Sequence, residues 1–209
     1  MPRIIAGLVA FLIALGGAAP LSAHRLDEYL QALRVDVRTD GIVVELDLTP
    51  GANLAADVVA ALDTNADGAI EPSEADAYVA GVIQSLEVSV DDRPVALGLV
   101  SQNMPSVDDV AAGSGVINLM VRADVDQARG RHRLRLSNGY RSDVGVYLAN
   151  ALRPDSRAIT IASQARDPRQ QTLTIDYVVN APLAATASAW TGLALVLLGF
   201  CAWWRRRPL

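Results

Sequence analysis

Apolar and polar residues alternate along most of the middle of the chain, and this period of two restricts the fold more than any other feature. Successive side chains of a β-strand point to opposite faces, so alternation predicts strands with one buried face. The turn signals Asp40–Gly41 and Asp91–Asp92–Arg93 each separate two runs and predict hairpins, and Asn138–Gly139 closes the run at 131–137. We expect an antiparallel β-sandwich of some nine short strands, at about 33–37, 42–48, 86–90, 95–99, 116–123, 131–137, 143–149, 157–164 and 171–179.

One segment departs from this period. In residues 53–62 and 72–83 apolar side chains recur every three or four residues, which predicts two short helices. Asn53 is a candidate cap for the first helix, and Pro72 suits the first turn of the second. The pair forms a helical insertion at about 53–84. Residues 101–114 show neither period and are expected to be a mobile loop.

The connection between the two predicted helices reads DTNADGAIEPSE, residues 63–74. Hard cations prefer six to eight oxygen ligands, and a loop of this length can wrap them around one ion. Gly68 allows the sharp turn in the middle of the loop. The candidate metal ligands are Asp63, Asn65, Asp67, the carbonyl of Ala69, Glu71, and Glu74 as a bidentate carboxylate.

This spacing resembles the calcium-binding loop of the EF-hand family, over about residues 53–83. The resemblance implies Ca²⁺ as the bound ion. The alternative is a polar loop whose acids face water. No second loop of this kind occurs in the chain, so Ile70 must dock on the β-body or the protein must dimerise. A single site outside the cell membrane needs only weak affinity, and we expect structural calcium rather than calcium sensing.

Both ends of the chain are hydrophobic. Residues 1–23 have the charged start, apolar run and small residues of a signal peptide, with an uncleaved anchor helix as the alternative. Residues 182–204 carry no charge and are long enough to cross a bilayer, and three arginines follow in the tail 205–209. These patterns predict a single-pass bacterial cell-membrane protein with its body, residues 24–181, in the periplasm or outside the cell. A processed C-terminal sorting signal and a buried C-terminal helix are the alternatives.

Composition narrows the function. Residues 24–181 contain all 23 acids and 14 of the 18 basic residues, which disfavours nucleic acid and anionic lipid surfaces as partners. The chain has no lysine, which excludes Schiff-base and Ser–Lys chemistry. Its only cysteine, Cys201, lies in the predicted span and it has two histidines, which leaves Ser–His–Asp and Cys–His enzymes little to work with. We expect a protein that is not an enzyme. A hydrolase that uses a pair of carboxylates stays open as an alternative.

The two histidines suggest a second metal site. Cleavage after Ala23 would make His24 the amino terminus, where its amine and imidazole could chelate copper or nickel, with or without His132. The alternative is that His24 is incidental and His132 lies at the edge of the core. The opening HRLDEYLQALRVDV and the phrases YLANAL and SQARD are loosely similar to extracytoplasmic domains associated with nickel/cobalt-type transporters.

Two functions therefore follow from the sequence. The first is a membrane-tethered calcium-binding interaction module. The second, which the transporter resemblance implies, is an accessory protein for nickel, cobalt or copper handling beside a membrane transporter. Its partner would be a protein or a transporter.

Overall fold

A computed structural model describes residues 26–180. The predicted signal peptide 1–23, the predicted span 182–204 and the tail 205–209 lie outside these residues, and so does His24. Within residues 26–180 no helix is both long and apolar enough to cross a membrane.

The described chain is mainly β and forms two five-stranded sheets. The first sheet has the spatial order β5-β6-β2-β1-β8, with the bounds β1 (Tyr29–Arg38), β2 (Gly41–Pro50), β5 (Gly98–Asn103), β6 (Ile117–Asp124) and β8 (Gly145–Ala151). The second has the order β4-β3-β7-β10-β9, with the bounds β3 (Leu86–Val90), β4 (Arg93–Val95), β7 (Gly130–Asn138), β9 (Ile159–Arg166) and β10 (Thr172–Val179).

One hydrophobic core lies between the sheets. Alternate residues of the central strands β1, β2, β7 and β10 are buried, and they join a single cluster that draws on both sheets. This is the pattern that the alternation predicted, and the mainly β, sandwich-like fold is confirmed. The hairpin turns are also where they were expected. Arg38 pairs with Gly41 in the first, and Asp91 and Asp92 adopt positive φ in the second.

The prediction of a wholly antiparallel fold is wrong at one pair of strands. β8 runs parallel to β1, with Tyr29 opposite Gly145 and Val35 opposite Ala151. Alternation specifies which face of a strand is buried but not which neighbour the strand pairs with, so the sequence held no signal for this arrangement.

The segment after the second hairpin also differs from the prediction. The run at 95–99 does not continue one strand, because β4 ends at Val95 and the chain crosses to the other sheet to form β5. Pro94 fits β4 because this strand lies at a sheet edge, where a missing amide donor costs no ladder bond. The irregular loop expected at 101–114 is instead the end of β5 and a short helix, α4 (Val107–Ala111), which Ser106 caps.

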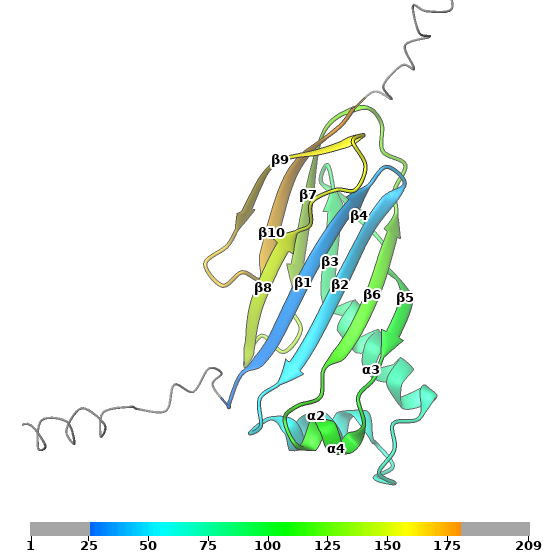
Figure 1. Ribbon diagram of the computed structural model, residues 1–209, viewed down its shortest axis with the longest axis vertical. Helices are drawn as coiled ribbons and strands as arrows, with labels where there is room; N and C mark the ends of the chain where they lie inside the picture. Colours follow the sequence, from blue (N-terminus) through cyan, green and yellow to red (C-terminus); the bar gives the residue numbers. More distant parts are fainter. Residues whose placement is uncertain (1–25, 181–209) are drawn as a thin grey trace, which may run out of the picture.

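Two longer helices form the predicted insertion, α2 (Ala55–Leu62) and α3 (Pro72–Gln84). Asn53 does not cap α2, because Leu54 occupies the cap position without a side-chain bond. The three helices of residues 26–180 lie together at one end of the sandwich, where β1 begins, and β10 ends at the opposite end (Figure 1).

The core makes a direct prediction about stability. Leu46 is 1% exposed and lies in register between Leu33 of β1 and Leu119 of β6. The Leu46→Ala variant should lose about 2–5 kcal/mol of unfolding free energy, because the cavity cannot close. Urea unfolding followed by circular dichroism measures this loss. The exposed control Glu87→Ala should change the same quantity by less than about 0.5 kcal/mol, and equal losses would contradict the assignment of the core.

Candidate metal-binding loop

The predicted loop occupies the connection between α2 and α3. Helix α2 ends at Leu62, directly before the first loop position, and Asp63 closes its last turn by donating its backbone N–H to the carbonyl of Val59. Helix α3 begins at Pro72, so the last three loop positions form its first turn. The two helices therefore flank the loop as the sequence predicted.

The last loop position, Glu74, is held over the start of the loop. Its carboxylate is buried, and Oε1 accepts hydrogen bonds from the backbone N–H of Thr64 at 2.6 Å, the Thr64 hydroxyl at 2.6 Å and the N–H of Asn65 at 3.2 Å. Oε2 accepts a bond from the N–H of Glu71 at 3.1 Å, which completes a capping box at the start of α3. These donors, the Thr64 hydroxyl first, lower the pKa of Glu74, so the group is a carboxylate at neutral pH.

The first loop position, Asp63, is buried in a similar way. Its two oxygens accept bonds from the N–H groups of Asp67 at 3.1 Å and Gly68 at 2.9 Å. Gly68 has a φ of +87°, the left-handed conformation that the sharp turn requires. Asn65 and Asp67 repeat the pattern, since each side-chain oxygen accepts a bond from an N–H two residues further on. The loop thus directs its side-chain oxygens toward its own amides.

The donor set suits a hard cation. The proposed ligands are oxygen atoms only, which favours Ca²⁺ or Mg²⁺ over transition metals. Between Arg38 and Arg93 the sequence has no basic residue, and among residues 26–180 neither Asp63 nor Glu74 forms an ion pair with arginine or histidine. Buried carboxylates without a positive partner are unusual, and a bound cation would supply one.

The loop oxygens are engaged with loop amides. Within residues 26–180 no group of three or more histidine, cysteine or acidic side chains is placed to hold a metal ion. The side chain of Glu71 is exposed, and Glu71 contacts the Glu74 carboxylate through its backbone N–H. Ion binding would therefore exchange the hydrogen bonds of Asp63, Asn65, Asp67 and Glu74 for metal contacts.

Two contacts join the loop to the β-body. Ile70 is partly buried and packs against the hydrophobic core that the helices share with both sheets. Tyr78, one turn after Glu74 on α3, forms a 2.6 Å hydrogen bond between its hydroxyl and that of Tyr29 at the start of β1. The ring of Tyr140 packs edge-on against both rings at 6.0 Å.

Sequence reasoning missed two features of this region. Thr64 supplies two of the four bonds to the Glu74 carboxylate, although its loop position carries no metal-ligand role that would single it out. The tyrosine cluster was also missed, because its members are far apart in the chain and only the tertiary fold brings them together.

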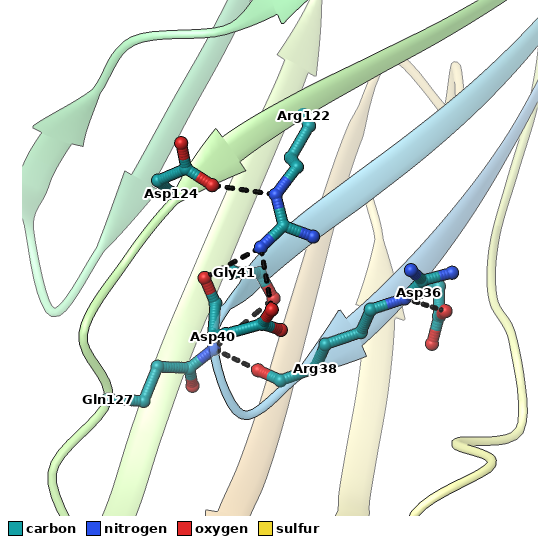
Figure 2. A network of polar contacts seen from close by, with 7 residues as sticks. All are labelled: Asp36, Arg38, Asp40, Gly41, Arg122, Asp124 and Gln127. Carbon is teal, nitrogen blue, oxygen red and sulfur yellow. Dashed lines mark hydrogen bonds and ion pairs between the residues drawn. The ribbon is translucent and has the colours of Figure 1, made fainter. Parts of the chain in front are cut away.

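Four aspartates outside the loop have structural partners. Figure 2 shows Arg122 between Asp40 and Asp124, with ion pairs of 2.9 and 2.6 Å at the first hairpin. Asp91 accepts bonds from His132, and Asp109 accepts one from the hydroxyl of Ser106. These contacts account for Asp40, Asp124, Asp91 and Asp109 without a metal.

His132 does not offer a free ligand atom. Its Nδ1 lies 2.7 Å from Oδ2 of Asp91, and its Nε2 lies 2.7 Å from the carbonyl oxygen of Ala128. Both neighbours are acceptors here, so both nitrogens donate and the ring is an imidazolium. The Asp91 carboxylate accordingly raises the pKa of His132. A site shared with His24 stays a prediction, because His24 lies outside the described residues.

Comparisons with protein-family models, with curated proteins and with solved structures found no match for this chain.

The His132–Asp91 pair predicts a pH dependence of stability. The folded pKa of His132 lies above its ordinary value of 6.5, so its contribution is fully present below about pH 6.5 and is lost as pH rises through the folded pKa. Between pH 6 and pH 9 the unfolding free energy should therefore fall more steeply for the wild type than for His132→Gln. Urea unfolding at several pH values measures the difference. Parallel pH profiles would contradict the ion pair.

Proposed function

We propose that this chain is a membrane-tethered, extracytoplasmic calcium-binding protein, in which one ion in the loop at residues 63–74 stiffens an end of an interaction module. One observation carries the proposal. The first and last loop positions, Asp63 and Glu74, are buried carboxylates that face the same loop and have no cationic partner among residues 26–180. A divalent cation with oxygen ligands fits this charge and this donor chemistry.

The ligands would be the six that the sequence suggested. Asp63, Asn65 and Asp67 contribute side-chain oxygens, Ala69 its carbonyl, and Glu71 a direct or water-bridged contact. Glu74 contributes both carboxylate oxygens, which now accept bonds from Thr64, Asn65 and Glu71. Calcium tolerates such an irregular set of six to eight oxygens, whereas Mg²⁺ requires six tight ligands and retains its waters.

The affinity should be modest. Four carboxylates within twelve residues repel one another, and ion binding relieves that repulsion. Binding must also break the hydrogen bonds that order the free loop, and this opposing term lowers the net gain. We therefore expect a Kd in the range of roughly 10⁻⁴–10⁻³ M that extracellular modules show.

A structural role for the ion is supported by the position of α3. Its buried face carries Glu74 and, one turn later, Tyr78, which is hydrogen-bonded to β1. An ion that fixes Glu74 would therefore also restrain the helix that packs on the sandwich. Opening of α3 would break the buried Tyr78–Tyr29 hydrogen bond and uncover Val79 and Val82, which favours a structural role over a sensor role.

Calcium should stabilise the wild-type protein and not its loop variants. At a tenfold excess over Kd the gain is about 1.4 kcal/mol, which raises Tm by a few degrees relative to chelator. Asp63→Asn and Glu74→Gln each remove one charged ligand and should abolish that difference. Thermal unfolding in calcium and in chelator, with calorimetric titration, measures both effects, and Mg²⁺ should substitute poorly.

A matched control separates ligand loss from general charge loss. Glu87→Gln removes one exposed carboxylate on β3, outside the loop, and should keep the full calcium-dependent rise in Tm. Because Glu74→Gln also weakens the capping box, only the calcium-dependent difference is compared, not the absolute Tm. If calcium gives no binding heat and chelator does not change the Tm of the wild type, the loop does not bind calcium and is only a solvated turn.

The membrane tether is proposed from the sequence of residues 182–204 and the arginines that follow. A topology reporter fused after Leu209 should be active in the cytoplasm and inactive outside it. A reporter active only outside would contradict this orientation. A mature protein that ends near residue 185 would favour the sorting-signal alternative instead.

A further inference from the structure

We infer that the end of the sandwich at which β10 terminates rests on the bilayer surface, and that four exposed arginines there face anionic lipid headgroups. These residues, Arg129, Arg131, Arg153 and Arg157, are called the arginine end. The inference rests on the proposed membrane tether, and it adds a second contact between the body and the membrane.

The distance along the chain is the first argument. Asn180, directly after β10, donates its backbone N–H to the carbonyl of Ala158 at 2.7 Å, and its side chain donates to the carbonyl of Arg157 at 3.1 Å and the hydroxyl of Thr160 at 2.9 Å. The predicted span begins at residue 182. A chain extends at most about 3.5 Å per residue, so this linker cannot hold the body far from the bilayer.

The four arginines lie at this same end. Arg131 pairs in register with Val178, and Val178 pairs on its other side with Thr160, so β7, β10 and β9 reach the end together. Arg129 directly precedes β7, and Arg153 and Arg157 lie in the connection from β8 to β9. All four side chains are exposed, and within residues 26–180 none of them forms an ion pair or a side-chain hydrogen bond.

Half of the six acids at this end form ion pairs. Arg122 pairs with Asp40 and Asp124, and His132 pairs with Asp91. Three carboxylates at this end, those of Asp92, Asp126 and Asp155, form no ion pair in the described chain, and the unpaired Arg93 adds a fifth guanidinium to the four. Six arginines and His132 thus face six aspartates, so this end is close to neutral overall, and the attraction to an anionic surface comes from the five unpaired guanidiniums, which outnumber the three unpaired carboxylates.

Charge is unevenly divided over the whole body. Residues 127–180 contain nine arginines and four carboxylates, whereas residues 26–126 contain four arginines and nineteen carboxylates. The three helices, at the opposite end from the arginine end, carry acids and no basic residue (Figure 1). The overall negative charge that disfavoured lipid contact thus resides mainly in the first part of the chain. An anionic bilayer would repel the acidic helices and attract the arginines, and both effects would turn the arginine end toward the membrane.

A recess at this end suits headgroups. An open hollow of about 890 Å³ lies between residues 151–157 and β9, and its polar lining includes Arg153, Asp155, Arg157, Thr160 and Gln164. Guanidinium groups bind phosphate oxygens in a bidentate way, and a neighbouring hydroxyl and amide add hydrogen bonds. The partly buried Leu152 and Pro154 line the same hollow and offer apolar contact to the glycerol region.

Quenching of a label in nanodiscs tests the inference. The full-length protein, with Cys201→Ser, carries one fluorophore at Ala128→Cys beside the arginine end, or at the exposed Ala60→Cys on α2. In nanodiscs with phosphatidylglycerol and nitroxide-headgroup lipid, the label at residue 128 should be quenched several-fold more than the label at residue 60. Phosphatidylcholine nanodiscs or high salt should reduce this difference.

Arginine variants identify the contact. Each arginine near an anionic surface contributes roughly a fivefold factor, so Arg153→Gln with Arg157→Gln should lower the population in contact by about an order of magnitude. The matched control is Arg135→Gln with Arg169→Gln, which also removes two exposed arginines that form no ion pair in the described chain. Arg135 lies within β7 and Arg169 lies in the connection from β9 to β10, so this control should leave quenching unchanged.

The outcomes separate the two proposals. A protein that does not enter nanodiscs and is released from membranes by alkaline carbonate contradicts the tether itself. A protein that is embedded but shows equal quenching at both labels, or no effect of the Arg153 and Arg157 changes, overturns the lipid contact alone. Equal quenching would leave the arginines free for an acidic protein.

Discussion

The hydroxyl–hydroxyl bond between Tyr78 and Tyr29 is the contact through which the helical end and the sandwich become one body. Tyr29 is fully buried at the first position of β1, and burial raises the pKa of both phenols, so each is a neutral hydroxyl that needs a partner. Their bond fixes how α3 is rotated against the sheets. Since Glu74 lies one turn before Tyr78, the same rotation places its carboxylate over the start of the loop.

A second buried polar contact holds the other side of this junction. Gln31 of β1 donates to the carbonyl of Tyr140 and accepts a bond from Asn138, the last residue of β7. Asn138 in turn accepts a bond from the N–H of Tyr140, which keeps the Tyr140 ring against the other two tyrosines. The network therefore links both sheets to α3, the helix that follows the candidate loop at residues 63–74, and it lies at the helical end of the sandwich.

Much of this architecture could be predicted from the sequence, and each prediction that was wrong has a specific physical cause. Alternation and turn residues located the strands, because burial of one face is a local property of each strand. The two helices and the loop between them were also found, since their period and their oxygen-bearing side chains are local signals. Partner choice is not local, so the parallel β1–β8 pair was missed. The five-residue α4 was missed because it buries only Val110 and shows no helical period.

The candidate site divides in the same way. The positions of Asp63 and Glu74 at the two ends of the loop followed from spacing alone, whereas their burial and their amide partners depend on how α2 and α3 pack. No motif could show that Thr64 donates to the Glu74 carboxylate, or that among residues 26–180 no arginine pairs with Asp63 or Glu74. The imidazolium character of His132 required the carbonyl of Ala128, which tertiary structure supplies.

The placement of the first and last strands has a mechanical consequence. β1 starts at the helical end and β10 finishes at the other, so a pull between Tyr29 and Val179 acts along the strands (Figure 1). The ladders of β1 with β2 and with β8 then carry the load in shear, and many of their hydrogen bonds must break together rather than one after another. A protein held at one end by a membrane and at the other by a partner would resist force well, in the way that load-bearing sandwich domains do.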